Sequence, residues 1–292
     1  MATTMTARRM EMLPARRQAL WGWPAVANFA LGGLGAGWYV VAVLAAGFER
    51  SSGVLAASWV APVLVLAGFA AVAAEAGRPL RGARVLTRLR TSWMSRELLV
   101  GIAFVLLVAA DLAFPLRLHR AQAVVAALLL ALAQGFIVRR ARGVTAWDVP
   151  LMPLLFLLSA VLSGAGAYLL VEVVAGRRPV PALVAALLGL LVVAFVAWTR
   201  YLVWTSEDSY ARAVAPLRTG RPALIIDGAG YGLPLLIGLL ALAAPAVAPP
   251  LLGLAGALLV GGQVYAKARL VLAAGQLRPI TLAIIPSRRR SS

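Results

Sequence analysis

Eight long apolar runs occupy most of this chain, and no other feature limits its fold so strongly. A helix needs roughly 17–25 apolar residues to cross a hydrocarbon core about 30 Å thick, and the runs match or approach that length. Only helices and closed barrels satisfy every backbone polar group within a bilayer, and no run shows the strict alternation of a barrel strand. The sequence therefore predicts an all-α integral membrane protein that folds as a bundle of eight transmembrane helices.

The predicted spans follow one another closely along the chain. They cover residues 24–47, 54–76, 98–115, 121–138, 150–175, 181–204, 228–244 and 251–266. The connections are short except 77–96 and 206–227, which leaves no room for a separate soluble domain. We predict a single membrane domain over residues 1–292, with an N-terminal segment at 1–20, the spans within 24–266 and a basic tail at 267–292.

The distribution of charge predicts the orientation in the membrane. The chain is 62% hydrophobic and 13% charged, with 28 Lys and Arg against 10 Asp and Glu, which excludes an ordinary soluble domain. The net charge of +18 needs no nucleic-acid partner, because the cations form short clusters between spans and not one basic face on a polar chain. The cations predicted on one side of the membrane are only Arg50, Arg117, Arg120, Arg177 and Arg178. All other Lys and Arg lie on the opposite side, so we expect both termini in the cytoplasm of a bacterium, with the spans in its inner membrane.

The residue types restrict the redox chemistry that the chain can perform by itself. It has no Cys and a single His, His119. This composition excludes a thiolate-bound iron–sulfur cluster, a Cys-rich zinc site and a haem held by two His ligands. We therefore expect no metal site in this chain, and any redox reaction must use a bound organic cofactor or neighbouring subunits.

A glycine-rich string lies in the first predicted span, from Asn28 to Tyr39 (NFALGGLGAGWY). It is not a phosphate-binding loop, because no strand precedes it and the third glycine of that motif would be Trp38. The spacing of Gly33 and Gly37 allows another helix to approach closely. The alternative is that the missing side chains leave a slot for a flat ring.

A second polar stretch joins the second and third spans. Glu75 lies at the end of one span and Glu97 at the start of the next, with Arg78, Trp93 and Arg96 close in sequence. An ionisable residue at membrane depth is a candidate functional residue, because it is costly unless it is paired or faces water. The alternative is that both glutamates lie at headgroup level and pair with the surrounding arginines.

Three motifs together resemble those of the NrfD-like membrane anchors. They are WGWPAVANFALGGLGAG in the first span, and EAGRPLR and SWMSREL between the second and third spans. This family includes the anchor subunits of dimethyl sulfoxide reductase, polysulfide reductase and phenylacetyl-CoA:acceptor oxidoreductase. The resemblance is most specific over residues 21–98, and the predicted number of spans fits the dimethyl sulfoxide reductase branch.

The resemblance implies a haem-free subunit that binds menaquinone or ubiquinone and exchanges electrons with a four-cluster ferredoxin-like iron–sulfur subunit. That partner is joined to a molybdopterin-type catalytic subunit, as in anaerobic respiration. Glu97 matches the acid that closes the family's Ser-x-Glu motif, which is linked to quinol binding. Glu75 stands four residues before Pro79, where relatives carry a His or an acid, and Asn28 falls where relatives place a polar quinone contact. The absence of His at positions 28 and 75 departs from those relatives.

Quinol oxidation needs a base with access to water, and a carboxylate at a span end can serve as that base. Glu97 and Glu75 are the candidates for it. Trp93 could stack on the ring, Arg96 could hold the carboxylate or donate to a ring oxygen, and Arg78 completes the predicted quinone-binding set with Asn28.

Two other functions remain open at this point. A small permease could use Glu75, Glu97, Asp111 and Asp227 to line a transport path, although the two matching halves typical of many transporters are not visible. A purely structural anchor would hold the enzyme subunits at the membrane without contacting quinone.

Overall fold

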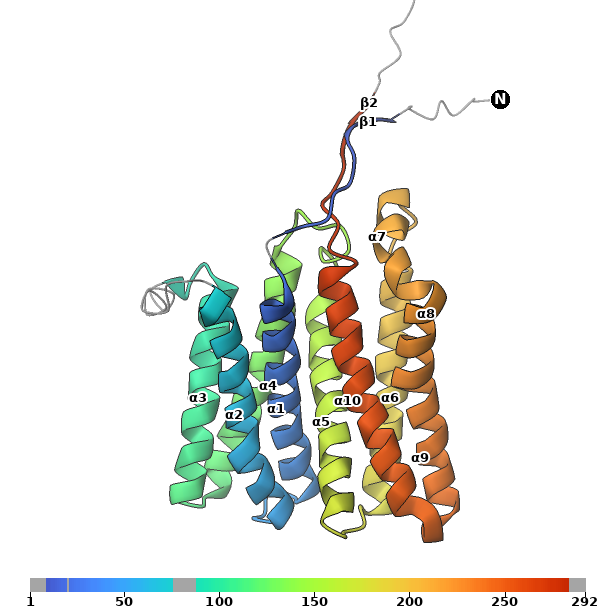
Figure 1. Cartoon of the computed structure of the whole chain (residues 1–292). Helices are drawn as coiled ribbons and strands as arrows, with labels where there is room; N and C mark the ends of the chain where they lie inside the picture. Colours follow the sequence, from blue (N-terminus) through green and yellow to red (C-terminus); the bar gives the residue numbers. More distant parts are fainter. Residues whose placement is uncertain (1–8, 20, 76–87, 284–292) are drawn as a thin grey trace, which may run out of the picture.

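The computed structural model describes residues 9–19, 21–75 and 88–283. Within these residues, long helices stand side by side in one bundle (Figure 1). The long helices are α1 (Trp23–Ala45), α2 (Ser52–Glu75), α3 (Trp93–Ala113), α4 (Arg117–Arg140), α5 (Met152–Val174), α6 (Pro181–Leu202) and α10 (Ala248–Leu272). The remaining helical elements are α7 (Asp208–Arg218), α8 (Gly220–Ala223), the π-helix η2 (Leu224–Gly232), α9 (Leu233–Ala243) and the short 3₁₀ turn η3 (Pro245–Val247).

Within the residues that the structure describes, seven helical segments are long and apolar enough to cross a membrane, so the protein is an integral membrane protein. They are α1, α2, α4, α5, α6, the run from Gly220 to Ala243 and the run from Pro245 to Leu272. The predicted spans are confirmed for these seven. The helix that is not among them is α3, which is 21 residues long and carries Arg96, Glu97 and Asp111.

Two groups of helices meet along α1 and α5. Helices α1 to α4 form one group, and α10 joins α5 to η2 and α9 in the other. Gly37 of α1 lies directly against the backbone of Ala160 on α5, and Gly164 of α5 lies against the backbone of Gly37. A Cβ atom at either glycine would overlap the facing backbone, so the glycine string acts here as the close helix contact that its spacing predicts.

Both ends of the described chain leave the bundle at the same end, above α1 and α10 in Figure 1. There β1 (Arg9–Leu13) pairs antiparallel with β2 (Ile280–Ala283). We call this end of the bundle the terminal end and the opposite one the far end. The predicted all-α fold class is confirmed, and this short antiparallel pair at the two chain ends lies outside the helical bundle.

Several helices extend beyond the predicted spans. Helix α3 begins at Trp93, after Ser92, whose hydroxyl accepts a hydrogen bond from the Ser95 main-chain N–H at 3.4 Å. Ser at this position is a favoured helix cap, so the helix starts before the apolar run does. Helix α10 continues to Leu272, so Lys267 belongs to a helix and not to the basic tail.

Candidate functional site

Glu97 lies at the centre of a buried polar cluster that three helices build. Asn28 of α1 donates through Nδ2 to Glu97 Oε1 at 2.8 Å. Gln134 of α4 donates through Nε2 to the same oxygen at 3.2 Å and to the main-chain oxygen of Asn28 at 3.2 Å. The three residues are 5% (Glu97), 5% (Asn28) and 1% (Gln134) exposed. We call Asn28, Glu97 and Gln134 the Glu97 cluster.

Small residues create the space for this cluster. A Cβ atom at Gly32 would lie 2.5 Å from Gln134 Nε2, so only glycine admits that amide beside α1. A Cβ atom at Gly68 of α2 would lie 3.1 Å from both the Cα and the Oδ1 atoms of Asn28. The two glycines therefore let α4 and α2 approach α1 at the height of Glu97.

The cluster contains two hydrogen-bond acceptors without a donor. Asn28 Oδ1 and Gln134 Oε1 are buried and accept no hydrogen bond within the part of the chain that the structure describes. Buried side-chain acceptors are usually paired, and leaving one unpaired costs about 1–3 kcal/mol. The cluster is therefore suited to a ligand that carries a hydroxyl group.

Trp93 and Arg96 lie next to the cluster but face other partners. The Trp93 ring stacks on Phe136 of α4 with ring centroids 4.1 Å apart, and the Arg96 guanidinium lies 4.3 Å above the Trp93 ring. Arg96 also donates to the main-chain oxygens of Leu89 at 2.9 Å and Arg90 at 2.8 Å. Among the described residues, no ion pair joins Arg96 to Glu97. The tryptophan and the arginine instead close the terminal end of the contact between α3 and α4.

The other two predicted site residues lie outside the cluster. Glu75 is exposed as the last residue of α2, and its Oε1 atom would be 3.6 Å from a Cβ atom at Gly22. The structure does not bring Glu75 to Glu97. Arg78 falls in the segment 76–87, which is outside the described residues.

A second buried carboxylate lies near the far end of α3. Arg120 donates through Nε to Asp111 Oδ1 at 3.0 Å, and its Nη1 atom also contacts the main-chain oxygen of Phe48. Asp111 and Arg120 are 4% and 3% exposed. We call these two residues the Asp111 pair. A residue so close to the end of a span is usually solvated, but the short connection to α4 brings Arg120 against Asp111 and buries both.

Gln134 is the member of the Glu97 cluster that was not predicted from the sequence. The sequence does mark it, since Gln134 is a polar residue deep in an apolar run, and such residues are functional candidates. Its hydrogen bonds to Glu97 and Asn28, however, depend on how α4 packs against α1 and α3.

One family model, described as Polysulphide reductase, NrfD, matches residues 12–279, which is most of the chain. The chain belongs to the NrfD family. Proteins of this family are membrane subunits of oxidoreductase complexes that interact with quinones, and they normally partner with iron–sulfur and molybdopterin subunits. Among curated proteins, no match to the chain was found.

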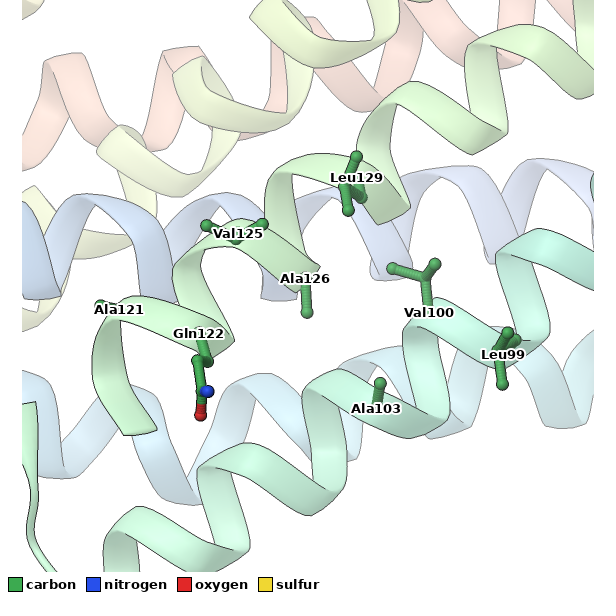
Figure 2. Close-up of a pocket in the computed structure, with 8 residues that line it drawn as sticks. All are labelled: Leu99, Val100, Ala103, Ala121, Gln122, Val125, Ala126 and Leu129. Carbon is green, nitrogen blue, oxygen red and sulfur yellow. The ribbon is translucent and has the colours of Figure 1, made fainter. Parts of the chain in front are cut away.

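This NrfD protein also carries an apolar groove on the outer face of α3 and α4, two of the helices that build the Glu97 cluster. Figure 2 shows the groove between α3 and α4, with a volume of about 450 Å³. It is lined by Leu99, Val100, Ala103, Ala121, Gln122, Val125, Ala126 and Leu129. Leu99 follows Glu97 by two residues, and Leu129 precedes Gln134 by five. These intervals put Leu99 and Leu129 on the outer faces of α3 and α4, where they are 45% and 47% exposed, whereas Glu97 and Gln134 point into the bundle and do not line the groove.

The polar groups of the NrfD chain are suited to binding an organic ring. It has no Cys, and the described residues contain no group of three or more His, Cys, Asp or Glu side chains that could hold a metal ion. Asn28 Oδ1 and Gln134 Oε1 are buried acceptors to which a hydroxyl group of a quinol can donate. The residues present therefore fit the cofactor class with which the family interacts.

Proposed function

We propose that this chain is the quinone-binding membrane anchor of a multisubunit oxidoreductase, and that the Glu97 cluster holds the quinone headgroup. The observation that carries the proposal is a buried carboxylate whose hydrogen-bond donors are two neutral amides, Asn28 and Gln134. Each of these amides also keeps an acceptor oxygen without a donor. Such a site can bind a hydroxyl group and receive its proton without first breaking an ion pair.

A bound quinol supplies two electrons and two protons when it is oxidised. Asn28 Oδ1 and Gln134 Oε1 would accept a hydrogen bond from a hydroxyl group of the ring and orient it. Both amide donors bind Oε1 of Glu97, which leaves Oε2 as the general base; it would take up the first proton, release it to water and then take up the second. The electrons leave through an iron–sulfur partner, and the same groups operate in reverse if the quinone is reduced.

The groove between α3 and α4 takes the hydrocarbon tail of the quinone. Its lining is apolar apart from Gln122, and alanines at positions 103, 121 and 126 make the hollow between larger neighbours (Figure 2). Burying apolar surface contributes about 25 cal/mol per Å², so a long tail adds affinity there. A quinone could then reach Glu97 from within the bilayer.

The proposed topology has eight spans, with α3 as the eighth. The charged residues of α3 are buried, since Glu97 bonds to neighbouring helices and Asp111 is paired with Arg120. Eight spans place both termini on one side, and the excess of Lys and Arg assigns that side to the cytoplasm of a bacterial inner membrane. The terminal end of the bundle is then cytoplasmic.

The cytoplasmic face is the proposed docking site for a four-cluster iron–sulfur subunit and, through it, a molybdopterin-type catalytic subunit. The basic residues at this end of the bundle include Arg88, Arg90, Arg200, Arg212, Arg218 and Arg221, which can steer an acidic partner surface. A cytoplasmic catalytic subunit suits an internal substrate such as a coenzyme A thioester. Protease treatment of right-side-out and inverted vesicles tests this: cleavage of the iron–sulfur subunit only from the periplasmic side would contradict it.

The structure gives the permease hypothesis no support. Its four candidate acids have different surroundings: Glu75 is exposed, Asp111 is ion-paired, and Asp227 accepts a hydrogen bond from Trp198 Nε1 at 2.9 Å. A purely structural anchor is distinguished by a binding experiment. We expect the purified chain in lipid nanodiscs to bind a quinol analogue, and Gln134→Leu to weaken that binding. Equal binding by Gln134→Leu, or no binding by the native chain, would contradict the proposed site.

A further inference from the structure

Lys267 is a buried amine in α10, at the junction of α10 with α1 and α5. It is only 4% exposed. A Cβ atom at Gly33 of α1 would lie 3.0 Å from Lys267 Nζ and 3.5 Å from Cβ of Ala160 on α5. Over the residues that the structure describes, Lys267 has no hydrogen bond or ion pair. A charged amine in such a position is costly without a nearby negative charge.

Glu97, in turn, lacks a positively charged partner. Its hydrogen-bond donors are neutral amides, and no cation pairs with it in the described part of the chain. The two groups lie at similar depth, since Glu97 is about one turn inside the start of α3 and Lys267 is between one and two turns before the end of α10.

Two adjacent glycines of α1 connect the two groups. Gly32 adjoins the Gln134 amide, which is bonded to Glu97, and Gly33 adjoins the Lys267 amine. Glu97 and Lys267 thus flank the same turn of α1. A helix with its side chains is about 10 Å across, which sets the scale of the separation.

We propose that Lys267 is the counter-charge of Glu97 across α1. In the neutral state, Glu97 is a carboxylic acid and Lys267 an amine; in the charged state, they are a carboxylate and an ammonium group. One proton leaves Glu97 and one joins Lys267, so the net charge inside the bundle does not change. This inference rests on the proposed function and adds a residue that controls when Glu97 can act as a base.

Other ionisable groups on the elements around α10 have to be distinguished from Glu97. They are Tyr39 on α1, Tyr168 and Glu172 on α5, Asp227 and Tyr231 on η2, Asp208, Tyr210, Arg212 and Arg218 on α7, and Tyr265 and Arg269 on α10 itself. Glu172 is paired with Arg177, and Arg269 donates to the main-chain oxygen of Pro216 at 3.1 Å. Asp227, which has Trp198 as its hydrogen-bond partner, is the rival counter-charge.

Infrared titration of the full chain in lipid nanodiscs, without quinol, tests the proposal. The carboxyl absorption that disappears in Glu97→Gln is assigned to Glu97 and followed against pH. In Lys267→Met, we expect the pH at which this absorption disappears to rise by about one unit, as for opposite charges about 10 Å apart at an effective dielectric constant near 20. Lys267→Gln should give the same shift with a polar side chain. Gln263→Leu is the matched control, because it removes a buried polar group one turn away without changing charge, and it should leave the titration unchanged.

The outcomes separate this inference from the proposed function. An unchanged Glu97 titration in both Lys267 variants would overturn the counter-charge. The carboxyl absorption that Asp227→Asn removes belongs to Asp227. A shift of that absorption in the Lys267 variants would also overturn the proposal, because Asp227 would then be the partner of Lys267. If the Glu97 absorption shifts but Glu97→Gln retains full quinol turnover, the counter-charge stands and the proposed function fails.

Discussion

Helix α3 carries two buried carboxylates about four turns apart, and their surroundings differ in one respect. Asp111 faces a buried arginine, whereas Glu97 faces two neutral amides. A carboxylate locked in an ion pair stabilises the fold but cannot easily exchange a proton. A carboxylate held by amides alone remains available for proton transfer. The difference is the basis for proposing that Asp111 stabilises the fold and that Glu97 exchanges protons.

Removing the cation of the Asp111 pair should have the largest effect on stability. Arg120→Met leaves Asp111 buried without a partner, which costs about 3–5 kcal/mol. Thermal unfolding of the purified chain should show a clear loss of stability. The double variant Asp111→Asn with Arg120→Met should recover much of it. Equal stability of Arg120→Met and the native chain would show that the pair contributes nothing.

Removing an amide from the Glu97 cluster should reduce quinol turnover with little loss of assembly. Asn28→Leu and Gln134→Leu each delete a hydrogen bond to a carboxylate, which corresponds to a roughly 10–100-fold drop in turnover. Steady-state quinol oxidation by the assembled complex measures the change. Gln122→Leu, on the same helix as Gln134 but in the groove, is the control and should keep near-native turnover with a tail-less quinol.

Filling the groove should weaken the binding of long-tailed quinols and leave the binding of tail-less quinols unchanged. Ala103→Trp places a large side chain in the hollow of Figure 2 and should raise the KM for a long-tailed quinol roughly tenfold, equivalent to about 1.4 kcal/mol. The KM for a tail-less analogue should not change. Ala186→Trp, at an exposed position on α6, is the matched control. Equal changes for both quinols would mean that the groove holds only membrane lipid.

Neutralising the exposed acid should have the smallest effect. Glu75 lies at the end of α2, outside the Glu97 cluster, so Glu75→Gln should change quinol turnover by less than about threefold. A loss as large as that in Glu97→Gln would place Glu75 on the proton path.

Seven of the predicted spans are confirmed, and the sequence singled out Asn28 and Glu97, which the structure joins by a hydrogen bond, because long apolar runs and polar residues within them are local features. The sequence could not predict that Gln134 completes the cluster, since Gly32 of α1 and Gln134 of α4 meet only in the folded bundle. Arg120 was counted among interfacial cations, because charge patterns do not reveal which arginine turns inward. Lys267 was assigned to the basic tail for the same reason.

Quinol turnover by Glu97→Gln tests the central claim most directly. Gln keeps the shape of the side chain and removes the base, so turnover should fall about 10²–10⁴-fold while the complex still assembles. Asp111→Asn, the matched change at the other carboxylate of α3, should keep most of the turnover of the complex that assembles. Full quinol-linked turnover by assembled Glu97→Gln would contradict the account and make Glu97 a structural residue like Asp111.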